Sequence, residues 1–95
     1  MIISQLSIAP VGEGTSLSKY VKIVIDVLKR SNIKFETNDM ATVIETEDLN
    51  TLFRVVEEAH KTVTDAGVKR VITELKIDDR RDKEIVIGTK VKSVQ

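Results

Sequence analysis

Two amphipathic helical patterns, each enclosed between stretches that alternate polar and apolar residues, constrain this chain more than any other feature. The first pattern runs over residues 17–30 and the second over residues 49–66. Apolar residues recur in both at intervals of three and four, which is the spacing of one helix face. Each predicted helix therefore has one face to bury, and the neighbouring stretches must cover it.

Four stretches with a two-residue period flank these helices, at residues 2–9, 33–37, 41–47 and 70–78. The first is predicted to turn Leu6 and Ile8 inward and Gln5 and Ser7 outward. The last has one apolar face for a core, and its opposite face carries Arg70, Ile72, Glu74, Lys76 and Asp78. We interpret all four as strands of a sheet that is buried on one side.

Local signals indicate where these elements begin and end. Pro10 ends the first strand because it lacks a backbone donor, and Asn38-Asp39 indicates a turn between the middle strands. Ser16 and Asp48 are predicted to cap the two helices at their N-termini, and Gly67 follows the second helix.

The order of elements is therefore strand, helix, strand, strand, helix, strand. Because crossover connections are right-handed, this order predicts a ferredoxin-like α+β sandwich with an antiparallel sheet of order 4-1-3-2 and both helices on one face. Ninety-five residues suit a single domain, 1–95. Residues 82–95 form a short C-terminal extension, which is compatible with either a short strand or a helical turn.

Composition excludes several classes of function. Fifteen basic and fifteen acidic residues give a formal net charge of zero, and aromatic residues make up only 3% of the chain. Both values argue against nucleic-acid binding. The chain has no cysteine and one histidine, which excludes a Cys-ligated zinc site. With no basic segment leading into a long apolar run, we expect a cytoplasmic protein with no membrane partner and no metal site.

The face of the sheet without helices is predicted to collect polar groups. Its central strands bring together Ser7, Glu45, Glu74 and Lys76 among apolar side chains. Such a face is a poor solvent surface, and polar groups that become buried need partners. Those partners are either a second chain or a bound ligand.

A second candidate region is the loop that enters the first helix. Gly12, Thr15 and Ser16 lie where free N–H groups and the helix dipole can hold an anion, although the loop lacks the Walker pattern and a simple capped turn is the alternative. Arg80 lies in the run Asp78-Asp79-Arg80-Arg81, which is either an anion site or a charge network that fixes a turn. His60 is expected to pack at a helix edge.

Segments along nearly the whole chain resemble a known family. They read Ser7-Ile8-Ala9-Pro10-Val11-Gly12, Gly14-Thr15-Ser16-Leu17-Ser18, Thr42-Val43-Ile44-Glu45, Ala59-His60, Ala66-Gly67-Val68-Lys69-Arg70-Val71, Lys76-Ile77-Asp78-Asp79-Arg80-Arg81 and Lys90-Val91. In this order and spacing the chain resembles the thiamine-binding protein family related to YkoF.

The resemblance implies a ferredoxin-like protomer that assembles through its sheets into dimers or tetramers. It also implies binding of thiamine or a related hydroxymethylpyrimidine, with no catalysis and no other cofactor. The positions that match, and that become candidates for ligand or fold, are Ser7, Pro10, Gly12, Thr15, Ser16, Thr42, Glu45, Arg70, Lys76, Asp78 and Arg80.

Combining the two lines of reasoning, we predict a ligand site made of Ser7, Thr42, Glu45, Glu74 and Lys76. A carboxylate can bind a ring nitrogen and the exocyclic amine of an aminopyrimidine, and a second carboxylate can face the cationic thiazolium. The alternative is that both glutamates form cross-strand ion pairs with Lys76 or Arg70.

A second function stays open from the residues alone. A regulatory or structural oligomerisation module would bind another small anion, at Gly12–Ser16 and Arg80, or only a second copy of itself. Catalysis is not expected, because no serine has an identifiable activating base.

Overall fold

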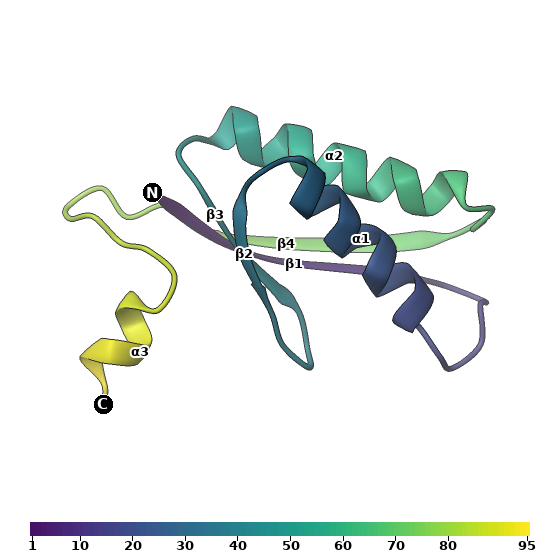
Figure 1. Ribbon diagram of the computed structural model, residues 1–95, viewed down its shortest axis with the longest axis horizontal. Helices are drawn as coiled ribbons and strands as arrows, with labels where there is room; N and C mark the ends of the chain where they lie inside the picture. The colour runs from purple at the N-terminus through teal and green to yellow at the C-terminus, as the bar shows by residue number, and fades with distance from the viewer.

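The computed structural model describes residues 1–95 and shows one antiparallel sheet with two long helices on one face (Figure 1). The elements are β1 Ile2–Pro10, α1 Ser18–Arg30, β2 Lys34–Thr37, β3 Thr42–Thr46, α2 Leu49–Asp65, β4 Val71–Asp78 and α3 Thr89–Ser93. The strands lie in the order β2-β3-β1-β4, which is the predicted order read from the other edge. The ferredoxin-like prediction is therefore confirmed.

The central strand β1 pairs with both β3 and β4, but over different lengths. It pairs with β3 only from Ile2 to Leu6, whereas it pairs with β4 from Ile3 to Pro10. One end of the sheet is therefore four strands wide. The other end is a ribbon of β1 and β4 alone.

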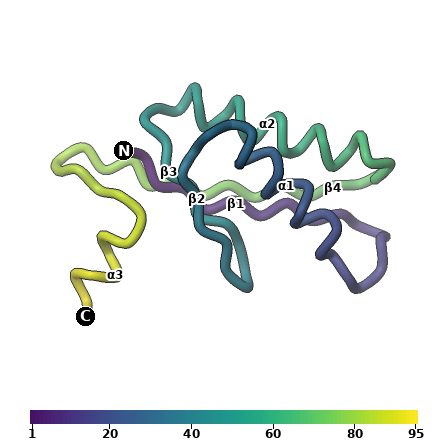
Figure 2. Tube along the Cα trace, viewed as in Figure 1, coloured from purple at the N-terminus to yellow at the C-terminus, as the bar shows by residue number.

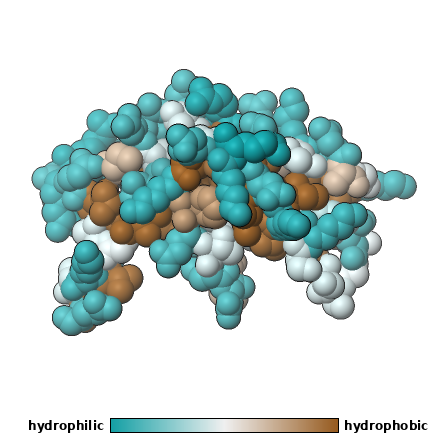
Figure 3. Space-filling model, in the orientation of Figure 1, coloured by the Kyte–Doolittle hydropathy of each residue, from teal (hydrophilic) through white to brown (hydrophobic).

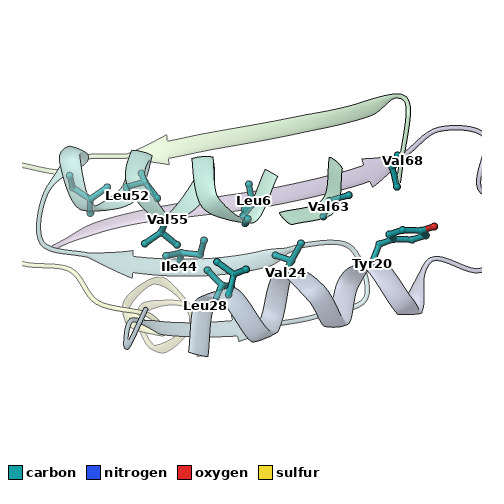
Figure 4. Packing of buried hydrophobic residues seen from close by; sticks show 12 residues of the cluster. Leu6, Tyr20, Val24, Leu28, Ile44, Leu52, Val55, Val63 and Val68 are labelled. Carbon is teal, nitrogen blue, oxygen red and sulfur yellow. The ribbon is translucent and has the colours of Figure 1, made fainter. Parts of the chain in front are cut away.

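The hydrophobic core lies between the sheet and the helices α1 and α2 (Figure 4). The side chains that are completely buried come from both helices and from β3: Val27, Leu28, Ile44, Leu52, Ala59 and Val63. Leu6 is buried and Ile8 packs against this cluster, as predicted for the inward face of the first strand. Phe53 is 50% exposed, because Leu52 and Val55 occupy the buried face of α2.

The predicted helix ends are right for α2 and wrong for α1. Asp48 caps α2 by accepting a hydrogen bond from the Thr51 N–H at 2.7 Å, and Gly67 follows with a positive φ of 95°. In α1 the cap position is Leu17, not Ser16, and no side chain caps the helix. The Leu17 carbonyl accepts the first helical bond, from the Tyr20 N–H, so the helix begins beyond Ser16.

The C-terminal extension turns back at one end of the sheet, on the side that α1 and α2 leave uncovered (Figures 1 and 2). It ends in the short helix α3, which resolves the ambiguity left by the sequence in favour of a helical turn. Ile85 anchors the extension and is only 5% exposed. The expectation of a bare face is therefore wrong for the part of the sheet that this extension approaches.

We expect Ile44→Ala to lower the free energy of unfolding by about 2–5 kcal/mol, because it opens a cavity at a fully buried position of β3. Val21→Ala, at a 40% exposed position of α1, is the control and should change it by less than about 1 kcal/mol. Urea unfolding followed by circular dichroism measures both values. Equal effects of the two substitutions would contradict the packing described.

Candidate functional site

A hollow lies between the uncovered sheet face and the C-terminal extension. It is a groove of about 690 Å³, and Figure 3 shows it as the gap between the lobe of α3 and the lobe of the β2–β3 hairpin. The side chains around it come from both sides and include Ile3, Gln5, Glu36, Val43, Lys76 and Asp78 of the sheet and Ile85, Ile87, Lys90 and Val91 of the extension. We call this hollow the groove.

The strand register decides which side chains share the floor of the groove. Two rows of directly opposed residues cross all four strands: Glu36, Val43, Gln5 and Lys76 in the first row, and Lys34, Glu45, Ile3 and Asp78 in the second. Opposed residues of antiparallel strands project from the same face. The two central strands therefore contribute apolar Ile3 and Val43 next to polar Gln5 and Glu45, and the two outer strands contribute only charged residues.

Glu45 is held by the C-terminal extension and not by a neighbouring strand. Its Oε1 accepts a hydrogen bond from the Ile87 N–H at 2.9 Å. The alternative expectation, cross-strand ion pairs, is absent, because no ion pair in the structure includes Glu45, Glu74, Lys76 or Arg70. A carboxylate with one further oxygen therefore lies at the groove.

Asp78 is the second carboxylate that contacts the extension. Its Oδ2 lies 3.1 Å from the Lys90 Nζ, and it occupies the same row of the sheet as Glu45, with Ile3 between them. Both carboxylates thus contact one segment from two positions on the floor. Together they define the acidic side of the groove.

The turn after β4 is a charge network, as one of the two sequence interpretations expected. Arg80 donates two hydrogen bonds to Asp82, from Nε at 2.6 Å and from an amino group at 3.0 Å, and Arg81 pairs with Asp79 at 3.4 Å. The bond from Arg80 lowers the pKa of Asp82, and the same bond raises the pKa of Arg80. The guanidinium of Arg80 is therefore already engaged by a carboxylate.

The structure separates the predicted anion-binding residues. Gly12, Thr15 and Ser16 follow the end of β1, whereas Arg80 lies beyond the end of β4, beside the start of β1. A nine-residue strand spans about 30 Å, so these groups do not form one site. Nothing in this geometry favours the second function, an anion-binding module at these residues.

The loop itself carries a negative group. Tyr20 Oη donates a hydrogen bond to Glu13 Oε1 at 2.7 Å, and this bond raises the pKa of Tyr20. A carboxylate in that position repels an anion. The hydrogen bond between Glu13 and Tyr20 instead holds the loop against the start of α1.

The predicted ligand residues divide into three groups. Lys76 lines the groove and Glu45 contacts its wall, whereas Ser7 and Glu74 oppose each other one row farther along, in the two-stranded part of the sheet. Thr42 is 6% exposed on the helix-covered face and shares a hydrogen bond with Thr37. Strand residues alternate, so Thr42 and Glu45 project from opposite faces, and the sequence alone was sufficient to show this.

Sequence reasoning missed the contribution of the C-terminal extension. Ile85, Ile87 and Lys90 supply one wall of the groove and contact both of its carboxylates. The available signal was the short apolar run from Ile85 to Ile87 within an otherwise polar tail. That run indicates burial but not the surface that it is buried against.

The side chains give little support for a catalytic histidine or a metal site. His60 Nδ1 lies 2.6 Å from Thr73 Oγ1, between α2 and the helix-covered face of β4, which fits the expected packing role. No group of three or more His, Cys, Asp or Glu side chains is placed to hold a metal ion. None of the helices has the length and apolar composition that a membrane span requires.

Known proteins of similar sequence match nearly the whole chain. A family model described as thiamine-binding protein matches residues 4–95. A UPF0045 protein of Methanocaldococcus jannaschii is 46% identical over 93 residues, covering 98% of this chain and 91% of that protein. A UPF0045 protein of Bacillus subtilis is 38% identical over 99 residues, covering 99% of this chain and 94% of its own length.

Solved structures share the fold. A crystal structure of the Methanocaldococcus protein superposes with a TM-score of 0.90, covering 98% of this chain and 94% of that one. A Bacillus cereus domain of unknown function gives 0.84 at 29% identity, covering 99% of this chain and 89% of that one. A Thermotoga maritima protein, described as a putative thiamine biosynthesis/salvage protein, gives a TM-score of 0.81 at 20% identity, covering 99% of this chain and 98% of that one. At this identity the likeness concerns the fold alone.

We expect Asp82 to titrate below its ordinary pKa of 3.8. Since the folded pKa is lowered, the Arg80–Asp82 contact stabilises the protein above pH 3.8, and the stabilisation is lost as pH falls through the lower, folded value. NMR titration of the Asp82 carboxyl carbon measures this. Arg80→Gln should return the midpoint toward 3.8 and Arg81→Gln should not; an unshifted midpoint in the wild type would contradict the pair.

Proposed function

The chain belongs to the thiamine-binding protein family, and from that premise we propose that it binds thiamine or a related hydroxymethylpyrimidine in the groove, without catalysing a reaction. The observation that carries the choice of site is the Glu45 carboxylate, which is held at the groove by a backbone N–H and not by a basic side chain. It therefore has no basic partner in the protein, and its second oxygen is free for a ligand.

The chemistry of the groove suits this class of ligand. An aminopyrimidine presents a ring nitrogen and an exocyclic amine side by side, and a carboxylate such as Glu45 binds such an edge. Thiamine also carries a permanent positive charge. The charged residues that line the groove balance, with Glu36 and Asp78 against Lys76 and Lys90, so a cation would be recognised by the individual carboxylates of Glu45 and Asp78 and not by an excess of charge.

The ring faces would rest on aliphatic side chains. Ile3 and Val43 lie on the floor, and Ile85, which is buried, lies on the wall. No aromatic residue lines the groove, so the cation is expected to be recognised by carboxylates and not by an aromatic face. Burial of flat, partly apolar rings against such side chains stabilises the complex in proportion to the area removed from water.

Binding without catalysis is supported by the position of the only histidine. His60 contacts Thr73 on the helix-covered side of the sheet, and it does not line the groove. No side chain that lines the groove is therefore paired with an imidazole base.

We further propose that copies of this chain associate through the part of the sheet face that the extension leaves open. That part carries Ala9 opposite Ile72 and Ser7 opposite Glu74, and Ile72 is 47% exposed. A second copy would remove the apolar surface from water and supply partners for the polar pair. A dimer or tetramer in the cytoplasm remains our prediction.

Isothermal titration calorimetry with thiamine should show binding to the wild type and weaker binding to Glu45→Gln. The amide keeps an oxygen for the Ile87 N–H but loses the charge that pairs with the ligand, and we expect affinity to fall about tenfold or more. Glu57→Gln, on an exposed part of α2 away from the groove, is the matched control. No heat with the wild type would refute the proposed ligand, and equal affinities would refute the role of Glu45.

Sedimentation velocity should show an oligomer for the wild type and a shift toward monomer for Ile72→Glu. The new carboxylate would lie beside Glu74 on the proposed contact surface and would be costly to bury. Val21→Glu places the same charge on an exposed part of α1 and should leave the oligomer intact. A wild-type monomer at the calorimetric concentration would rule out the association.

A further inference from the structure

The C-terminal extension contacts the two carboxylates that the proposed ligand would use. The Ile87 N–H donates to Glu45 at 2.9 Å and the Lys90 ammonium lies 3.1 Å from Asp78. Through these two contacts a single segment offers the sheet one N–H donor and one positive charge. A thiamine-like ligand offers the same two features.

Apart from Ile85 and the ion pair of Glu84 with the Met1 ammonium at 2.6 Å, few contacts fasten the extension to the rest of the molecule. Ile85 is buried, but Val86, Val91 and Val94 are 42%, 58% and 85% exposed, and α3 has no buried residue. The remaining hydrogen bonds of this part are internal, such as Thr89 Oγ1 accepting from the Val86 N–H. Residues 86–95 therefore form a small self-contained unit held mainly by the contacts to Glu45 and Asp78.

The energy that holds this unit in place is small. The side chains of Lys90 and Asp78 are 82% and 43% exposed, and an exposed ion pair contributes little to stability. Gly88, with a positive φ of 95°, supplies a turn between the Ile87 contact and α3. A unit with few buried contacts opens at low cost compared with the core.

We infer that residues 86–95 compete with the ligand for Glu45 and Asp78, so that filling the groove releases the extension from the sheet. This inference rests on the proposed function, because it concerns the same carboxylates. In the unliganded protein the extension occupies one oxygen of Glu45 and one of Asp78, and so keeps its own donor and cation at the groove. A ligand binds with an affinity reduced by the fraction of molecules in this closed state.

Two lysines of the extension allow a matched test of this competition. Lys90→Ala removes the contact with Asp78, whereas Lys92→Ala removes the same charge from an exposed position of α3 that pairs with no acid. By calorimetry we expect Lys90→Ala to bind thiamine about two- to fivefold more tightly than the wild type. Lys92→Ala should bind with unchanged affinity.

A second measurement separates displacement of the extension from a simple change of charge. The chain has no cysteine, so nitroxide labels can be attached specifically to the double variant Asn50→Cys/Val94→Cys, whose positions are both exposed. The distance distribution between the labels should broaden and shift when thiamine is added. In Lys90→Ala the same change should already be partly present without thiamine, and in Lys92→Ala it should not.

The outcomes distinguish the two proposals. If thiamine binds to no variant, the proposed function and this inference are both overturned. If thiamine binds but Lys90→Ala and Lys92→Ala have equal affinities, or the label distances stay the same on binding, only the competition is overturned. Tighter binding by Lys90→Ala together with a ligand-dependent distance change supports it.

Discussion

The pairing of β1 with β3 on one side and β4 on the other is the constraint on which the rest of this structure depends. Because β1 pairs with β3 for only part of its length, the sheet has a four-stranded end and a two-stranded end. The apolar face of all the strands is covered by α1 and α2, and the core forms there. The opposite face is left for other contacts.

The C-terminal extension contacts only one of the two ends of that opposite face. The four-stranded end carries Glu45 and Asp78 in one row, and the C-terminal extension returns to it. The two-stranded end carries Ser7 opposite Glu74 and lies outside the groove. A single uncovered face is thus divided between a groove for a small molecule and a surface for a second copy in the function we propose.

Several features of the site followed from residue alternation alone. Lys76 and Glu74 were placed on the uncovered face because Leu75 between them is apolar, and the structure agrees. The same alternation excludes Thr42 from the side of Glu45, although family resemblance had grouped them. Resemblance identifies positions that recur together, whereas the pleat of a strand decides which of them share a face.

The sequence by itself determined the number, order and inward faces of the strands and long helices, because period-2 and helical patterns are local and each must bury one side. Only the tertiary structure decided where the extension goes. Its apolar run has no period of its own, and its path depends on the turn from Asp79 to Asp82 and on the acids it meets. The groove, which needs both walls, therefore exists only in the folded protein.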